Sequence, residues 1–114
     1  MTVTIWHNPR CSKSRAALAL IRARGIEPRV VEYLAAPPGV AEIRDALMRL
    51  GLPAHALLRR CEPACRAQGL GPGTDEATLI AAMAAEPVLI ERPVVLAPNG
   101  ACIARPPERV ADIL

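Results

Sequence analysis

The chain has 114 residues and a formal net charge of +3 at pH 7, a size that supports one domain with its own core and not two. Its apolar runs are shorter than the roughly 20 residues that cross a membrane, no basic-then-apolar leader follows Met1, and only Trp6 and Tyr33 can stack on bases. This composition argues against membrane insertion, export and nucleic-acid binding, and it predicts a cytoplasmic protein whose four cysteines stay reduced.

The first predicted elements are a short buried strand at residues 3–6 and a helix at residues 12–24, with Leu20 and Arg24 near its apolar face and Gly25 ending it. Cys11 lies at the junction between them. The first turn of a helix has unpaired backbone N–H groups and a partial positive charge, which favour a thiolate. The same amides can hold an oxyanion. The position therefore predicts a reactive cysteine rather than an inert buried one.

A second strand is expected at residues 30–34, which makes a βαβ unit with parallel strands and a right-handed crossover. Pro37 and Pro38 end this unit. The next helix is predicted over residues 40–50 with Gly51 ending it, and Pro53 opens a shorter helical piece through residues 57 and 58. Residues 67–73 are rich in glycine and proline and read as a loop. The middle of the chain is therefore helical.

A further helix is predicted to begin with Thr74 as its N-cap and to run to about Ala85. Strands at residues 94–97 and 101–104 follow, joined through residues 98–100, where Asn-Gly favours a tight hairpin turn. Pro107 begins a final helix. This order predicts an α/β, thioredoxin-like fold in a single domain of residues 1–114, with a helical insertion at about residues 39–90.

Pro93 stands directly before the third predicted strand, where thioredoxin-like folds typically place a cis-proline. A cis bond before proline costs only about 0.5–1 kcal/mol, so one is available here, but an ordinary trans proline at the start of a strand stays open. Cys61, Cys65 and Cys102 have no position that favours reactivity and are more typical of inert thiols, but whether any of them forms an intramolecular resolving pair stays open. Cys61 and Cys65 lie four residues apart, but no His or Cys follows at zinc-ligand spacing, so no metal site is predicted.

Five sequence blocks carry a resemblance to a known family. They are IWHNPRCSKSR at residues 5–15, EYL at 32–34, ALLRR at 56–60, IERPVV at 90–95 and IARPPE at 103–108. In these blocks, and over essentially its whole length, the chain resembles the arsenate reductases of the thioredoxin superfamily that are coupled to glutathione and glutaredoxin. Five blocks in one order make this resemblance far more specific than the cysteine segment alone.

The resemblance implies that Cys11 is the nucleophile and that Arg59, Arg92 and Arg105 bind the arsenate oxyanion. Arginine suits this task because its planar fork of donors matches a tetrahedral anion. It further implies an arsenic detoxification reaction in which Cys11 forms an adduct with arsenate, glutathione joins at arsenic, and glutaredoxin removes the glutathione so that arsenite leaves. Glutathione is then a co-substrate, and no bound cofactor or metal is needed.

Three neighbours of Cys11 complete the predicted site. His7, as an imidazolium, would favour the Cys11 thiolate, and the resemblance credits it with such help, but a purely structural hydrogen-bonding role stays open. Ser14 can donate a hydrogen bond to the thiolate or to an arsenate oxygen. Asn8 is expected to order the loop through backbone hydrogen bonds at the substrate site.

Two other functions stay open. Residues 11–14 have the C-x-x-S form of a monothiol glutaredoxin-like thiol-disulfide oxidoreductase, although such an enzyme has no evident need for three arginines. A related branch of the same superfamily consists of redox-responsive regulators that bind RNA polymerase, and this is the second alternative. Those commonly carry a C-x-x-C switch, and Ser14 in place of the second cysteine counts against that function.

Overall fold

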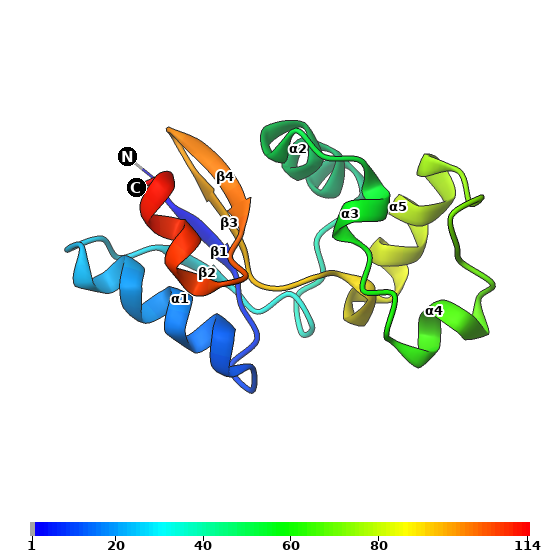
Figure 1. Ribbon diagram of the computed structural model, residues 1–114, viewed down its shortest axis with the longest axis horizontal. Helices are drawn as coiled ribbons and strands as arrows, with labels where there is room; N and C mark the ends of the chain where they lie inside the picture. Colours follow the sequence, from blue (N-terminus) through cyan, green and yellow to red (C-terminus); the bar gives the residue numbers. More distant parts are fainter. Residues whose placement is uncertain (1) are drawn as a thin grey trace. The chain divides into compact units, whose positions relative to one another are not determined.

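The computed structural model describes residues 2–114 as two compact units (Figure 1). The sheet unit consists of residues 2–36 and 92–114, and the helical unit is Pro37–Glu91. The insertion predicted at about residues 39–90 falls within the helical unit. Within residues 2–114, no helix has the length and apolar character needed to span a bilayer.

The sheet unit contains four strands, β1 (Thr4–Trp6), β2 (Arg29–Val31), β3 (Val94–Ala97) and β4 (Gly100–Ile103), in the order β2-β1-β3-β4. β1 pairs in parallel with β2, as predicted, and antiparallel with β3, which pairs antiparallel with β4. β2 is shorter than the predicted strand at residues 30–34. The carbonyl oxygen of Glu32 accepts hydrogen bonds from the amides of Ala35 and Ala36, and this turn takes the chain out of the sheet.

Two helices, α1 (Ser12–Ala23) and η2 (Pro107–Asp112), pack against each other and against one face of the sheet (Figure 1). The buried face of α1 consists of Ser14, Ala17 and Ile21, which have the i, i+3, i+7 spacing of a helix stripe. Leu20 and Arg24 were expected near this face, but both are exposed because they lie to its side. The predicted C-terminal helix exists as a 3₁₀ helix.

The β3–β4 hairpin has a tighter connection than predicted, because β4 begins at Gly100, which pairs with Ala97. Only Pro98 and Asn99 connect the strands. A turn with Asn-Gly at its centre needs positive φ angles, yet no non-glycine residue within residues 2–114 has one. Gly100 instead allows close packing against Ile113, the residue that follows η2, because a Cβ added at position 100 would lie 3.1 Å from Cγ2 of Ile113.

The helical unit contains α2 (Val40–Leu50), α3 (Ala54–Leu57), α4 (Pro63–Ala67), α5 (Glu76–Ala85) and η1 (Pro87–Leu89). α2 has the predicted bounds, and Gly51 caps it in the left-handed conformation at φ +67°. α4 was not predicted. α2, α3 and η1 each contact α5, and the largest fully buried side chains of this unit are those of Ile43, Leu57, Leu79, Met83, Leu89 and Ile90.

Asp75, not Thr74, is the N-cap of α5. Its carboxylate accepts hydrogen bonds from the amide and the hydroxyl of Thr78, and these bonds lower the pKa of Asp75. The Thr74 hydroxyl instead accepts a hydrogen bond from the amide of Gly71, which closes the preceding loop. The helix therefore begins one residue later than the hydroxyl at position 74 suggested.

Candidate functional site

The predicted reactive segments of the sheet unit meet at one edge of the sheet. Trp6 at the end of β1 is paired with Val94 at the start of β3, and Val94 is paired with Ile103 at the end of β4. The loop at residues 7–11, the segment before β3 and the segment after β4 therefore all leave the sheet at the same edge. Strand register thus places Cys11, Arg92 and Arg105 at this edge.

Cys11 is the N-cap residue of α1, with extended backbone at φ −92° and ψ 121°. Its carbonyl oxygen accepts the amide hydrogen of Arg15 at 3.0 Å, and its own amide donates to the carbonyl oxygen of Asn8 at 3.0 Å. Its side chain is half-buried and makes no capping hydrogen bond, and no acidic residue lies in the first turn of the helix. The sulfur therefore lies at the positive end of the α1 dipole and is not used to cap the helix.

A buried hydrogen-bond network holds the loop that leads to Cys11. The Ser14 hydroxyl lies 2.6 Å from Nδ1 of His7 and accepts the amide of Asn8 at 3.0 Å. The Asn8 side chain accepts the amide of Arg10 at 3.0 Å, as expected for a residue that orders the loop. Ser14 is fully buried, and its hydroxyl is engaged by His7 and Asn8. Its contacts are therefore those of a loop-positioning residue.

His7 is only 6% exposed, and burial is the main cause that lowers its pKa below 6.5. The charge of Glu32 opposes this shift, whereas Arg22 and Arg15 add to it. A lowered pKa favours the neutral imidazole at pH 7. This favours the structural hydrogen-bonding role over the imidazolium role. A neutral ring can accept the Ser14 hydroxyl hydrogen at Nδ1.

The burial of His7 predicts a pH-dependent stability. Because the unfolded chain binds the histidine proton at a higher pH than the folded one, the free energy of unfolding should fall as pH decreases below 6.5, down to the folded pKa. The measurement is urea unfolding of the wild type and His7→Gln at pH 7.5 and 5. The wild type should lose more stability than the variant. An equal loss in both proteins would contradict the prediction.

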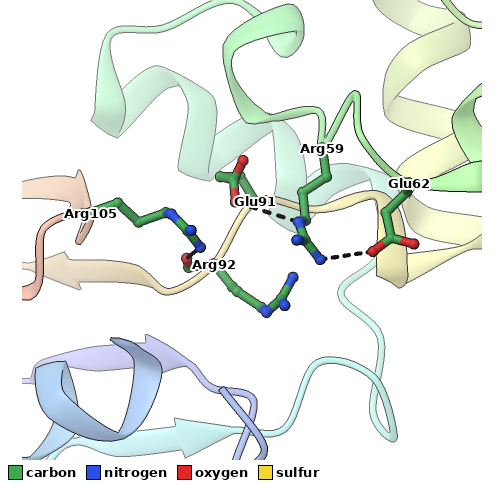
Figure 2. Close-up of polar contacts among 5 residues, drawn as sticks. All are labelled: Arg59, Glu62, Glu91, Arg92 and Arg105. Atoms are coloured by element: carbon green, nitrogen blue, oxygen red, sulfur yellow. Dashed lines mark hydrogen bonds and ion pairs between the residues drawn. The ribbon is translucent and has the colours of Figure 1, made fainter. Parts of the chain in front are cut away.

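Arg92 and Arg105 extend the β3–β4 pairing beyond the strands. The Ala104 amide donates to the Pro93 carbonyl at 2.8 Å, and Nη1 of Arg105 donates to the Arg92 carbonyl at 3.2 Å (Figure 2). The Arg92–Pro93 bond is cis, which is one of the two forms that the sequence left open, and the Arg105–Pro106 bond is also cis, which was not anticipated. Nε of Arg92 is buried and has no hydrogen-bond partner within residues 2–114. It therefore has donor capacity to offer an anion.

Arg59 belongs to the helical unit, where two carboxylates hold its guanidinium (Figure 2). Nη1 lies 2.8 Å from Oε1 of Glu62, and Nε lies 3.6 Å from Oε1 of Glu91, an ion pair too long for a hydrogen bond. Burial alone would lower the pKa of Arg59, but the hydrogen bond that its guanidinium donates to Glu62 and nearby negative charge more than offset this effect and raise that pKa. The side chain is 16% exposed. Its neighbour Arg60 is exposed in a turn rather than a helix.

The backbone around Arg59 is fixed by a short antiparallel pairing. The Arg59 amide donates to the Leu89 carbonyl, and the Glu91 amide donates to the Leu57 carbonyl, both at 2.7 Å. Sequence reasoning did not single out Glu62 and Glu91. Two signals were present: Glu62 is three residues after Arg59, and Glu91 stands directly before Arg92 in one of the five blocks.

The remaining cysteines are free thiols, with Cys61 exposed and Cys65 and Cys102 buried. Burial raises the pKa of Cys102, which keeps that thiol protonated. Cys65 donates a weak hydrogen bond to the Leu70 carbonyl. Within residues 2–114, no three His, Cys, Asp or Glu side chains are grouped so that they could hold a metal ion.

Comparisons with known proteins agree on one family. The model of the ArsC family matches residues 6–113. The arsenate reductase of Rhizobium meliloti is 47% identical over 100% of this chain and 82% of its own length. The uncharacterized protein YfgD of Escherichia coli is 46% identical over 98% of this chain and 96% of its own length. The solved arsenate reductase from Vibrio cholerae is 43% identical, with a TM-score of 0.95 over 100% of this chain and 98% of that one. With the strand order, this likeness confirms the predicted thioredoxin-like fold.

Proposed function

The chain belongs to the ArsC family, and we propose that it reduces arsenate to arsenite with Cys11 as its nucleophile. The observation that carries the proposal is the position of Cys11 at the amino end of α1, at the sheet edge that also carries Arg92 and Arg105. Arsenate reductases among its relatives, 47% identical in one case, support this substrate.

The proposed reaction begins when the Cys11 thiolate attacks arsenic and displaces one arsenate oxygen, which takes up protons and leaves as water. The thiol of glutathione then displaces a second oxygen as water, so that arsenic carries two sulfurs. A glutaredoxin thiolate attacks the glutathione sulfur and forms a disulfide with it. The electron pair of the broken sulfur–arsenic bond reduces arsenic from +5 to +3, and hydrolysis releases arsenite and restores Cys11.

In the first step, the arginines neutralise negative charge on the substrate. A thiolate and an arsenate anion repel each other unless cations neutralise the arsenate oxygens. We assign this role to Arg92 and Arg105, which share the sheet edge with Cys11, and to Arg59 on the basis of the family resemblance. His7, Ser14 and Asn8 hold the loop through the network described above, so they act on the reaction by positioning Cys11.

The electron donors are part of the proposal. A single active cysteine requires an external thiol, and residues 11–14 contain no second cysteine that could form an internal disulfide with Cys11. Glutathione as co-substrate and glutaredoxin as partner meet that need, and both are present in the cytoplasm where we place the protein. No bound metal or organic cofactor enters the scheme.

The test measures arsenite formed from arsenate by the purified protein under two regenerating systems, glutathione with glutaredoxin and, separately, thioredoxin with its reductase. We expect turnover with the first system only. Turnover with thioredoxin alone would overturn the proposed coupling. Reduction of a glutathione mixed disulfide without arsenite formation would instead identify a glutaredoxin-like enzyme, which the C-x-x-S sequence keeps as the second candidate.

Arg59→Ala should lower activity and stability together. The loss of one oxyanion donor should reduce kcat/KM for arsenate about 10²- to 10³-fold, and the partly buried carboxylates of Glu62 and Glu91 would lose a cation, at about 1–3 kcal/mol of unfolding free energy. The double variant Arg59→Ala/Glu62→Gln should regain stability but not activity. Arg60→Ala is the matched control, because it removes an exposed arginine, and equal losses in both arginine variants would contradict the assignment.

A further inference from the structure

The loop that carries Cys11 forms one wall of a groove within the sheet unit. The groove encloses about 490 Å³ and is lined by residues 7–10 on one side and by Glu32, Leu34 and Ala35 on the other. This volume falls within the usual range for a small-molecule site. We propose that this groove binds the tripeptide thiol co-substrate through its charged ends. The inference rests on the proposed function, since it names where that reaction takes up glutathione.

The charges of the groove match those of the ligand. Glutathione carries two carboxylates and one ammonium group at neutral pH. Arg10 offers a cation and Glu32 an anion, both are exposed, and neither side chain forms an ion pair or hydrogen bond within residues 2–114. Leu34 adds an apolar surface, because it is 45% exposed. One wall therefore suits a carboxylate and the other suits the ammonium end.

The loop wall exists before any ligand arrives. The Pro9 carbonyl accepts a hydrogen bond from Nη1 of Arg15 at 2.8 Å, and the Arg10 amide donates to the Asn8 side chain at 3.0 Å. The Ser14 hydroxyl fixes the start of the same loop. A preformed wall lowers the entropy lost on binding, which favours a site for a flexible peptide.

The groove is next to the nucleophile in the chain, because its lining ends at Arg10. Arg10 is covalently next to Cys11, and a peptide of three residues spans at most about 10 Å. The thiol of glutathione is on its central residue, so anchoring both ends in the groove leaves the sulfur free to reach arsenic held by Cys11. In that step a sulfur–arsenic bond forms, an arsenic–oxygen bond breaks, and the oxygen leaves as water with the thiol proton. No electrons are transferred until glutaredoxin acts.

The decisive experiment measures binding apart from turnover. S-methylglutathione cannot react with arsenic, and its titration followed by amide NMR should shift the signals of Asn8, Arg10, Leu34 and Ala35. Arg10→Ala and Glu32→Ala should each weaken this binding about fivefold. Arg24→Ala, which removes an exposed arginine from the same unit, is the control and should bind as the wild type does. Shifts at other residues, or no shifts at millimolar ligand, would overturn the inference.

Kinetics give a second readout. The KM for glutathione should rise in Arg10→Ala and Glu32→Ala by about the same fivefold factor, while the KM for arsenate stays unchanged. 2-Mercaptoethanol, which has no charged ends, should add to the arsenic held by Cys11 at the same rate in both variants as in the wild type, measured as adduct formation without turnover. A wild type that binds S-methylglutathione in the groove yet forms no arsenite would refute the proposed function and leave the groove assignment standing.

Discussion

Replacing Cys11 with serine should abolish arsenate reduction without harming the fold. A hydroxyl is a far weaker nucleophile than a thiolate at neutral pH, so kcat/KM should fall by about 10³-fold or more. Serine is a better N-cap residue than cysteine, and position 11 is the N-cap of α1. The free energy of unfolding should therefore stay equal or rise by up to about 1 kcal/mol. Arsenite production and urea unfolding measure the two quantities.

Cys61→Ser is the matched control for this variant. Cys61 is an exposed free thiol, so its replacement should change neither activity nor stability. If Cys11→Ser retains substantial turnover, or if Cys61→Ser loses it, the nucleophile has been assigned to the wrong sulfur.

Arg92→Ala should also cause a large loss of activity, as large as that of Arg59→Ala, but without a loss of stability. Removal of one preorganised donor to an oxyanion reduces kcat by about 10²- to 10³-fold. Nε of Arg92 is buried without a hydrogen bond, so its removal also relieves an unsatisfied polar group. We therefore expect an unfolding free energy equal to or above that of the wild type, in contrast to Arg59→Ala.

Two comparisons sharpen this prediction. Arg92→Lys keeps the charge but loses the planar fork of donors, so it should recover only part of the activity. Arg109→Ala removes an exposed arginine of η2 from the same unit and should remain fully active. A clear loss of stability in Arg92→Ala would show that the residue serves the fold rather than the substrate.

Local sequence signals predicted those elements whose ends they encode. α2 has the predicted bounds because its apolar residues keep helical spacing from Val40 to Leu50 and Gly51 ends the helix directly after them. The length of β2 could not be predicted in this way, since the Glu32 carbonyl, rather than any special residue, closes the turn that ends it. The N-cap of α5 had two adjacent candidates, and hydrogen bonds to Gly71 and Thr78 decided between Thr74 and Asp75.

The sequence predicted which residues form the site better than it predicted the contacts between them. The βαβ and hairpin patterns predict the β1–β2 and β3–β4 pairs. The pairing of β1 with β3, which brings Cys11, Arg92 and Arg105 to one edge, follows from neither pattern, and a shared site was implied by the family resemblance. The burial of His7, and hence its lowered pKa, depends on packing that no local pattern encodes. The carboxylate of Glu91 reaches Arg59 only after distant segments pair, which sequence spacing does not show.

The strand order has a consequence for how the protein is made. β1 leaves the ribosome before the helical unit, but β3, its antiparallel neighbour, is synthesised only after the whole helical unit. Contacts between segments so far apart in the chain form late in folding. A nascent chain stalled at Glu91 should thus lack the central strand pair, and a protease should cleave it within β1. A chain long enough for β3 to leave the ribosome should be protected there.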